Sequence, residues 1–244
     1  MASRSKNKAY WDYWHELVKA SIHRNTREIP ALLRAGRFEG KKVLDAWCGP
    51  GRLLAVVARH ASMVVGVDDN VWALAGARKT IWLKGLKNVR VLKARLERLP
   101  FERNSFDVVY CMWALHYDKS WKKVLRGFVQ IVKPRGRVLV GFSSGNRDLP
   151  LFEGIVKRNH VKKLKRFEKS FDAFCKKQGW HVRVRRIPLA FEFSSPQRAL
   201  GVFLHTFLPK GISAQKKKEL LAFLERHSRR GITRVGQELV LYSI

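Results

Sequence analysis

The sequence predicts an α/β fold in which helices cover both faces of a mainly parallel sheet. From residue 42 to residue 142, short apolar runs typical of strands alternate with longer stretches of helical periodicity, and such alternation is typical of parallel sheets. In addition, residues 43–51, V-L-D-A-W-C-G-P-G, pass from an apolar strand through small, turn-forming residues into a helical pattern. A strand, a tight loop and a helix in this order are typical of a nucleotide-binding crevice.

The chain of 244 residues is long enough for one buried core, and its composition does not require a second independent domain. We expect residues 1–40 to form a helical cap. Residues 41–244 are expected to form a single domain with a basic helical insertion at about 145–165 and a second helical insertion at about 195–230. In the cap, residues 10–23 place Trp14, Leu17 and Ile22 on one helical face, and a short helix follows at 27–35. The first helix either covers the core or closes over the crevice with Tyr10, Trp11 or Tyr13.

Bulk composition argues against several classes of protein. No stretch approaches the roughly 18 uninterrupted apolar residues of a membrane-spanning helix. The first eight residues are polar and are not followed by the apolar core of a secretory signal, so we expect a cytoplasmic protein. Cys48, Cys111 and Cys175 form neither an even set nor a C-x-x-C pair. The sequence therefore predicts no disulfide framework and no metal site, and we expect reduced, mostly buried thiols.

Five strands are predicted in the alternating region, at residues 42–47, 63–68, 89–93, 105–111 and 137–142. The predicted helices between them are residues 50–60, 71–83 and 121–132, and K-P-R-G at 133–136 is predicted to be a turn. Right-handed crossovers that reverse direction once give the strand order 3-2-1-4-5. The crevice is then expected at the ends of the first, second and fourth strands.

The predicted elements beyond residue 142 are less regular. Residues 157–166 hold six cationic residues and no acid, as on a solvated helix face. Apolar residues then repeat at helical spacing up to Gly179, and residues 180–187 alternate as a strand with Val182 and Val184 inward. Two helices are predicted at 196–207 and 214–229, the second capped by Ser213, and a final strand at 238–244.

The net charge of +31 and the isoelectric point of about 10.8 are the most unusual bulk properties of this basic protein. Positive fields of this size favour nucleic acid and other polyanions. The charge is spread almost evenly along the chain, however, so a proteome that is basic throughout explains it equally well. Both interpretations remain open.

Five motifs follow one another in a specific order and spacing. They are V-L-D-A-W-C-G-P-G at 43–51, V-V-G-V-D at 64–68, L-P-F-E-R-N-S-F-D-V-V at 99–109, A-L-H-Y at 114–117 and K-P-R-G-R-V-L-V at 133–140. Together they resemble the class I S-adenosylmethionine-dependent methyltransferases, in the broad group called type 11. The resemblance implies a Rossmann-like three-layer sandwich with a seven-stranded sheet, order 3-2-1-4-5-7-6, whose last strand is antiparallel. It also implies a transferase that uses S-adenosyl-L-methionine for methylation.

The candidate cofactor ligands follow the predicted strand ends. Gly49 and Gly51 lack Cβ atoms, so the backbone after the first strand can pass close to the methionine part of the cofactor. Asp45 is placed to accept a hydrogen bond from the amino end of the cofactor or to order the loop through a water molecule. Asp68 suits the two ribose hydroxyls, and Asp69 could replace it in a shifted register. The complete predicted set is Tyr10, Asp45, Gly49, Gly51, Asp68, Asp69, Leu96 and Glu97.

Two positions depart from the family pattern. Residue 47 is Trp where the family usually has the first glycine of its loop, so the indole either packs beneath the loop or displaces it. Arg95 stands where the family often has an acid that receives the adenine amino group, and arginine only donates hydrogen bonds. Glu97 follows two residues on. Asp107 is expected to anchor the start of the fourth strand rather than to touch a ligand.

His116, after the fourth strand, is the candidate base or substrate contact because histidine titrates near neutral pH. Tyr117 has the same standing, and a packed, structural role is equally open. The chain has no N-P-P-Y motif and no Pro-Cys pair of the kinds that nucleobase methyltransferases use. We therefore expect Cys111 to be a buried wall residue rather than a nucleophile.

The sequence thus predicts an S-adenosylmethionine-dependent methyltransferase that transfers a methyl group by in-line displacement. The acceptor is expected between the crevice, the cap and the insertion after the fifth strand, and is either a small molecule or RNA. The alternative is a catalytically silent, basic protein that binds RNA or acts as a scaffold. No metal is expected to take part.

Overall fold

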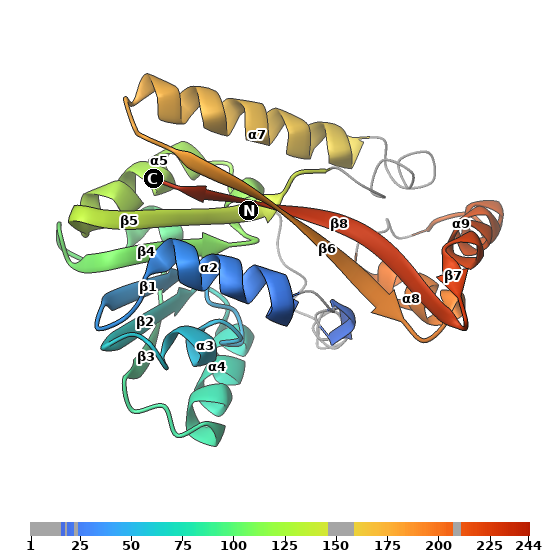
Figure 1. The fold of residues 1–244 in the computed structure, drawn as a ribbon, viewed down its shortest axis with the longest axis horizontal. Coiled ribbons are helices and arrows are strands. Elements are labelled where there is room, and N and C mark those ends of the chain that lie inside the picture. The colour runs from blue at the N-terminus through green and yellow to red at the C-terminus, as the bar shows by residue number, and fades with distance from the viewer. Residues whose placement is uncertain (1–15, 18, 22–23, 146–158, 207–210) are drawn as a thin grey trace. The chain divides into compact units, whose positions relative to one another are not determined.

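The computed structural model describes residues 16–17, 19–21, 24–145, 159–206 and 211–244 (Figure 1). The backbone divides into two compact units. The core unit holds Ile29–Phe142, Ala173–Arg185 and Val240–Ile244. The appended unit holds the described residues up to Glu28 and those of Ser143–Asp172 and Arg186–Leu239.

The core unit is built on a parallel sheet in the order β3-β2-β1-β4-β5. Its strands are β1 (Lys42–Ala46), β2 (Met63–Asp68), β3 (Val89–Lys93), β4 (Phe106–Met112) and β5 (Val132–Ser143). All four neighbouring pairs are parallel, and helices lie on both faces of the sheet. The central strands β1 and β4 are almost wholly buried, which is why they are nearly continuous apolar runs in the sequence.

Two long strands extend the sheet beyond β5, first β8 (Ile232–Ser243) and then β6 (Arg183–Phe193). Val138 and Ile244 exchange both backbone hydrogen bonds, at 3.0 and 2.9 Å, which is an antiparallel pattern. The predicted fold class and strand order are confirmed. Among the described residues the sheet has eight strands rather than seven, because the two-residue β7 (Ser228–Arg229) pairs with β8.

Helices connect the strands in both units. The π-helix η1 (Arg24–Glu28) runs into α2 (Ile29–Gly36), where a single helix was predicted. The other described helices are α3 (Leu54–Val57), α4 (Val71–Leu83), η2 (Leu96–Arg98), η3 (Leu115–Tyr117), α5 (Trp121–Ile131), α7 (Asn159–Lys177), α8 (Pro196–Thr206) and α9 (Ala214–Arg226). The prediction for α4 is confirmed at both ends. The predicted helix at 50–60 is wrong in length, because the residues after α3 form tighter bonds such as Arg59 N–H to Val56 O and His60 N–H to Val57 O.

One turn prediction and one strand prediction are also wrong in detail. The K-P-R-G segment lies inside β5 as a bulge, because four residues of β5 lie opposite a single residue of β4 between the pairs Phe106↔Val132 and Val108↔Arg137. Val184 does not face inward but is 46% exposed. In β6 the odd-numbered residues from Ile187 to Phe193 are buried, and a strand turns successive side chains to opposite faces, so an even-numbered residue points away from that core.

The appended unit has its own apolar core. Leu17 packs there with residues of β6, β8, α8 and α9, and Ser21 forms an isolated antiparallel bridge with Phe191. Ser213 caps α9 by accepting a hydrogen bond from Lys216 N–H, as predicted. The buried members of this core are Leu17, Phe191, Phe193, Ala199, Val202, Phe203, Leu220, Phe223, Leu224 and Val235.

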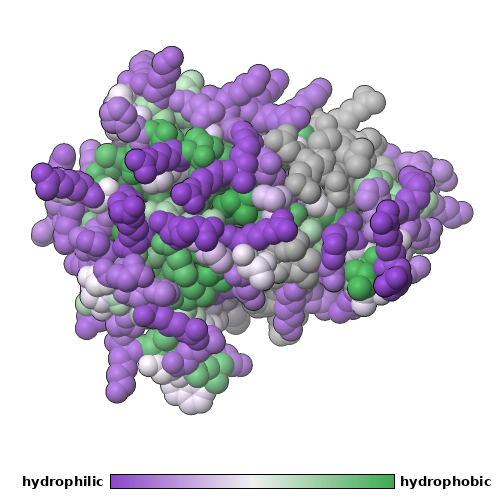
Figure 2. Space-filling view, viewed as in Figure 1, coloured by the Kyte–Doolittle hydropathy of each residue, from purple (hydrophilic) through white to green (hydrophobic). Residues whose placement is uncertain are grey.

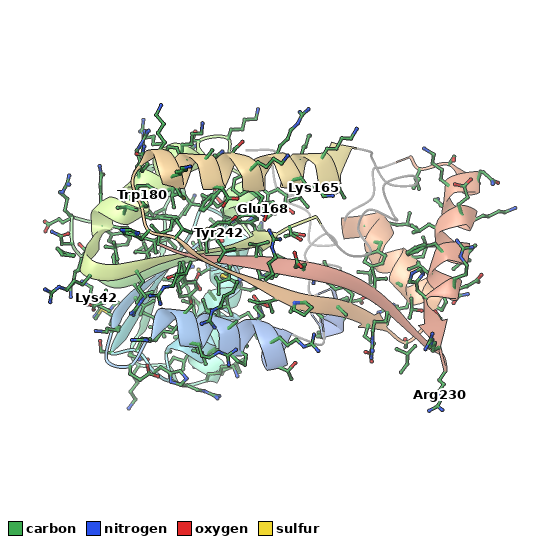
Figure 3. The ribbon with its side chains drawn as sticks, turned by 45° about the horizontal axis from the view of Figure 1, so that its top comes forward. Lys42, Lys165, Glu168, Trp180, Arg230 and Tyr242 are labelled. Atoms are coloured by element: carbon green, nitrogen blue, oxygen red, sulfur yellow. The ribbon has the colours of Figure 1, made fainter. Side chains whose placement is uncertain are left out.

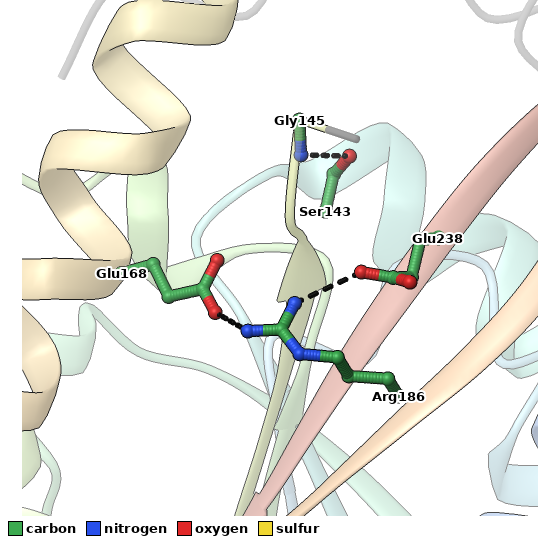
Figure 4. A network of polar contacts seen from close by, with 5 residues as sticks. All are labelled: Ser143, Gly145, Glu168, Arg186 and Glu238. Atoms are coloured by element: carbon green, nitrogen blue, oxygen red, sulfur yellow. Dashed lines mark hydrogen bonds and ion pairs between the residues drawn. The ribbon is translucent and has the colours of Figure 1, made fainter. Parts of the chain in front are cut away.

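A polar network joins three elements of the appended unit (Figure 4). Arg186 of β6 binds Glu168 of α7 through one guanidinium nitrogen and Glu238 of β8 through another, at 2.9 Å for the second pair. Partial burial acts to lower the pKa of Arg186, but the two carboxylates outweigh it and raise that pKa. The guanidinium therefore stays charged and ties the helix to both strands.

Several further predictions concern the chain as a whole. Most of the predicted cap helix at 10–23, with Tyr10 and Trp14, lies outside the described residues; Leu17 is buried as expected. Within the described residues, no helix combines the length and the apolar character needed to cross a membrane. Cys48, Cys111 and Cys175 are buried, as predicted.

Candidate active site

The loop after β1 is bound to the end of β2 through three successive backbone amides. The N–H groups of Trp47 and Cys48 both donate to Val67 O, at 2.8 and 2.9 Å. The N–H of Gly49 donates to Asp68 Oδ2 at 3.0 Å. The carboxyl ends of two neighbouring parallel strands are thus held together, at the edge where ligands bind in open α/β sheets.

The two predicted loop glycines have different surroundings. Gly49 has a φ of 55°, and a Cβ added there would meet no atom of the described part of the chain within 4 Å. Gly51 has a φ of 86°, and its Cβ would lie 3.2 Å from the Cα of Ala77. The space beside Gly49 is therefore open, whereas the missing Cβ of Gly51 lets α4 pack closely against the loop.

Trp47 adopts a left-handed backbone with a φ of 77°. This conformation costs an L-residue roughly 1–2 kcal/mol and suits glycine, which agrees with the glycine of the family pattern at this position. The side chain is 7% exposed, so the indole is buried. Trp113, after β4, is also left-handed, with a φ of 63°.

Asp45 is buried at the end of β1 and accepts a hydrogen bond from the Tyr110 hydroxyl at 2.7 Å. Burial raises the pKa of Asp45 to about 7, against the opposing effect of the Tyr110 hydrogen bond; nearby Asp68 raises it further, and Arg52 lowers it. Burial beside Asp45 likewise raises the pKa of Tyr110. Near neutral pH the buried Asp45 carboxyl is therefore protonated in some molecules and ionised in others.

The two acids at the end of β2 differ in accessibility. Asp68 is 1% exposed, and its oxygens accept from Gly49 N–H and, at 2.9 Å, from Asn70 N–H. Asn70 in turn caps α4 by accepting from the N–H groups of Trp72 and Ala73. Asp69 is partly exposed. Asp68 thus orders both the loop and the start of α4.

The predicted adenine region lies at η2. Leu96 is buried, and Glu97 accepts from Arg95 through Oε1 at 3.3 Å. Partial burial acts to raise the pKa of Glu97, but hydrogen bonds from its own backbone and from Arg95 outweigh it and lower that pKa. The second oxygen, Glu97 Oε2, is buried and has no hydrogen-bond partner among the described residues. Arg95 cannot itself accept a hydrogen bond, but it binds only Oε1 of Glu97. Among the described residues, Oε2 therefore remains available as an acceptor in this region.

The candidate catalytic residues lie together in η3. The rings of His116 and Tyr117 are 3.9 Å apart between centroids, tilted by 41°. His116 is partly buried near Phe142, at 6.3 Å between ring centroids, while Tyr117 is 53% exposed. Tyr10, the remaining predicted ligand, lies outside the described residues.

Asp107 anchors the start of β4, as predicted. Its Oδ2 accepts from the backbone N–H of Lys42 at 2.8 Å and its Oδ1 from Lys133 Nζ at 3.1 Å; Lys42 is labelled in Figure 3. Burial acts to raise the pKa of Asp107, but these two donors outweigh it and lower that pKa. These contacts are made at the start of β1 and β4, the opposite end from the loop.

The sequence analysis missed two polar residues of this site. Tyr110 could have been found, because a hydroxyl inside an apolar strand needs a hydrogen-bond partner. Asp118, at the end of η3, is buried; its Oδ1 accepts from Ser120 N–H and its Oδ2 has no partner among the described residues. Burial raises the pKa of Asp118, and nearby Glu97 adds to this effect. No sequence signal separates Asp118 from an ordinary loop acid.

Comparison with known proteins identifies the core. Residues 44–140 match the family model described as a methyltransferase domain, and they contain the bound loop, Asp68 and η2. These residues form a class I S-adenosylmethionine-dependent methyltransferase domain. The predicted resemblance and the predicted cofactor class are confirmed for this domain.

Two curated relatives match the same part of the chain. The ubiquinone/menaquinone biosynthesis C-methyltransferase of Idiomarina loihiensis is 34% identical over 136 residues, 54% of either chain. The ubiquinone biosynthesis O-methyltransferase of Cronobacter sakazakii is 36% identical over 115 residues, 47% of this chain and 46% of the other. The chain therefore spans about half the length of the curated relatives it matches.

A solved structure extends the likeness of the fold. The YcgJ protein of Bacillus subtilis superposes with a TM-score of 0.61 over 88% of this chain and 96% of that one. Sequence identity is 19%, so this likeness concerns the fold alone.

Proposed function

We propose that the whole chain is an S-adenosylmethionine-dependent methyltransferase that binds its methyl donor over the loop after β1. The open space beside Gly49 carries this proposal. The left-handed backbone of Gly49 exposes the chain to a ligand, and its amide is fixed by Asp68. A backbone that is held in place and open on one side can be approached closely without reorganisation.

The carboxylates of the site can accept hydrogen bonds from the donor groups of S-adenosylmethionine. We propose that the acids at the end of β2, Asp68 and Asp69, bind the ribose hydroxyls. The buried oxygen Oε2 of Glu97 is a charged acceptor for the adenine amino group, beside the apolar side chain of Leu96. Asp45 is assigned to the amino end of the methionine part.

Bound S-adenosylmethionine supplies a methyl group on a cationic sulfonium. An acceptor lone pair forms a bond to the methyl carbon, and the electron pair of the broken carbon–sulfur bond goes to sulfur. In this proposal His116 receives the acceptor proton, and Tyr117 contacts the acceptor from the same turn. The chain mainly positions the two reactants and excludes water.

We propose a small-molecule acceptor and a cytoplasmic location. The acceptor class is supported by the curated relatives, which are named for ubiquinone biosynthesis. One of these relatives is named for a carbon acceptor and the other for an oxygen acceptor. The proposal therefore extends to the acceptor class and not to the acceptor atom.

A second candidate is a catalytically silent, basic relative that binds RNA or acts as a scaffold. The large side chain of Trp47 at the glycine position favours it. Calorimetry with S-adenosylmethionine and S-adenosylhomocysteine separates the two candidates. We expect saturable binding that Asp68→Asn weakens and Asp107→Asn, at the opposite end of the strands, leaves unchanged; no heat of binding at millimolar ligand would support the silent relative.

The adenine assignment has a separate test. S-inosylhomocysteine carries a 6-oxo acceptor where S-adenosylhomocysteine has its 6-amino donor. Because a hydrogen bond to a charged group contributes about 1.5–3 kcal/mol, we expect the wild type to prefer the adenosyl compound by roughly 10- to 150-fold. Glu97→Leu should lose this preference. An equal preference in wild type and variant would remove Glu97 from the adenine site.

Transfer of labelled methyl from S-adenosylmethionine to fractionated cell extract tests activity and acceptor class together. We expect label in the small-molecule pool, also after the RNA has been digested. Label that appears in RNA and disappears on digestion would replace the small-molecule acceptor by RNA. His116→Gln should lower the rate without weakening the binding of S-adenosylhomocysteine.

A further inference from the structure

The outer face of α4 exposes large aromatic side chains. Trp72 and Trp82 are 65% and 78% exposed, and Leu83 beside the second is 62% exposed. The opposite face of the helix is buried through Ala73, Leu74 and Ala77. Over α4 in Figure 2, hydrophobic side chains reach the surface among hydrophilic ones. Exposed tryptophan at two places on one helix is unusual for a surface whose role is only solvation.

The exposed residues form a stripe in which a cation separates the two indoles. At 3.6 residues per turn, Trp72, Lys79 and Trp82 fall within about 80° of one another around the axis. The two tryptophans are about 15 Å apart along the helix, at 1.5 Å per residue. Arg78 lies at the edge of the stripe. We call Trp72, Arg78, Lys79 and Trp82 the α4 stripe.

The α4 stripe lies in a strongly cationic stretch of the chain. Residues 70–96 contain no acid. All the cations of this stretch are exposed: Arg78, Lys79, Lys84, Lys87, Arg90, Lys93 and Arg95. Only Arg95 among them is paired with a carboxylate in the described part of the chain. This local excess of charge is much higher than the diffuse excess of the whole chain, and it favours a polyanion.

We propose that the α4 stripe binds single-stranded nucleic acid. Unpaired bases stack on exposed aromatic side chains, and the cations between them bind the phosphates. A distance of about 15 Å corresponds to the rise of roughly four stacked nucleotides at 3.4 Å each. A membrane surface fits less well, because insertion of both indoles into an apolar layer would carry Lys79 with them.

The inner face of α4 joins this surface to the cofactor loop. Ala77 is in close contact with Gly51, and the Thr80 hydroxyl donates to Pro50 O at 2.9 Å. Trp72, on which a nucleic-acid base would stack, lies four residues after Asp68 in the sequence. Binding of nucleic acid to the α4 stripe does not require methyl transfer. A binding assay therefore tests this proposal separately from the proposed enzymatic activity.

Fluorescence anisotropy with a labelled 12-nucleotide oligouridine tests the α4 stripe in the full chain. Loss of one stacked base costs a factor of about 5 to 150, so we expect that much weaker binding for Trp72→Ala and for Trp82→Ala. The slope of log K against log salt is negative, and Arg78→Ala/Lys79→Ala should make it shallower by about 0.7 for each lost phosphate contact. Lys216→Ala/Lys217→Ala removes the same charge from exposed positions on α9 and should change the slope less.

Two comparisons make the test selective. A duplex of the same length hides its base faces, so it should bind more weakly than the single strand despite its higher charge. The double variant Trp72→Leu/Trp82→Leu keeps the apolar character but loses the indoles, and should lose oligouridine binding. Unchanged affinity in the tryptophan variants, or equal effects of the α4 and α9 charge variants, would overturn the proposal. Binding to phosphatidylserine vesicles that survives in the leucine variant, without binding to oligouridine, would replace nucleic acid by a membrane.

Discussion

Replacement of Asp45 by Asn should remove a pH dependence of stability that this single buried carboxyl creates. In the folded chain the pKa of Asp45 is about 7, whereas an unfolded aspartate has a pKa of about 3.9. Between these values the folded state holds a proton that the unfolded state has lost. The stabilising contribution is therefore present at low pH and is lost as the pH rises through 7.

The size of this effect follows from the pKa difference. At pH 5, about two units below the folded pKa, protonation stabilises the folded state by about 3 kcal/mol. At pH 8 the contribution is about zero. Because Asn does not titrate, the free energy of unfolding of the wild type minus that of Asp45→Asn should fall by roughly 2–3 kcal/mol from pH 5 to pH 8.

Urea unfolding of both proteins at pH 5, 6, 7 and 8 measures this difference. Asp107→Asn is the matched control, because the lowered pKa of Asp107 leaves it ionised in both states throughout this range, so its difference should stay flat. A difference for Asp45→Asn that is constant, or that grows with pH, would refute the assignment of a raised pKa to this carboxyl.

Three other substitutions give distinct results. Tyr110→Phe removes the hydroxyl that stabilises ionised Asp45, so the NMR titration of the Asp45 carboxyl carbon should move above its wild-type midpoint; a lower midpoint would contradict the hydrogen bond. Trp47→Gly relieves roughly 1–2 kcal/mol of backbone strain but loses about 4–6 kcal/mol of indole burial, so urea unfolding should show a net loss of stability, and a gain would contradict the burial. Arg186→Ala leaves two carboxylates without their shared cation and should cost roughly 1–3 kcal/mol, less than a fully buried pair because Arg186 is half exposed. Arg185→Ala, next to it and exposed, should cost under about 0.5 kcal/mol, and equal losses would contradict the network.

The parallel core could be predicted because its signals are local. The strands of the core unit are apolar runs, and α4 is bounded by the capping Asn70 and by the glycine at 85. The register of β6 was predicted one residue out of phase. Its first residues belong to the core unit and the rest to the appended unit, so the alternation around Val182 and Val184 does not continue the pattern of the buried residues from Ile187 onward.

Two features of the site could not be predicted, because they depend on contacts between distant residues. Asp45 and Tyr110 are 65 residues apart in sequence, and their hydrogen bond arises from the pairing of β1 with β4. Asp68 was predicted as a ribose ligand; its bonds to Gly49 and Asn70 add a role in ordering the loop that the spacing alone does not contain. The ligand roles of these residues stay predictions.

At Trp47 the family pattern has glycine, and two energies explain how the chain tolerates tryptophan there. A left-handed tryptophan costs roughly 1–2 kcal/mol, while burial of an indole contributes about 4–6 kcal/mol at 25 cal/mol per Å². Burial exceeds the strain, so tryptophan can hold a left-handed conformation that suits glycine, the usual residue of the family pattern. The amides of residues 47–49 remain bound to the end of β2, and the space beside Gly49 remains open. With Trp47 in place, the backbone of residues 47–49 is still held to β2, and measurement of the affinity for S-adenosylmethionine distinguishes the enzyme from its silent alternative.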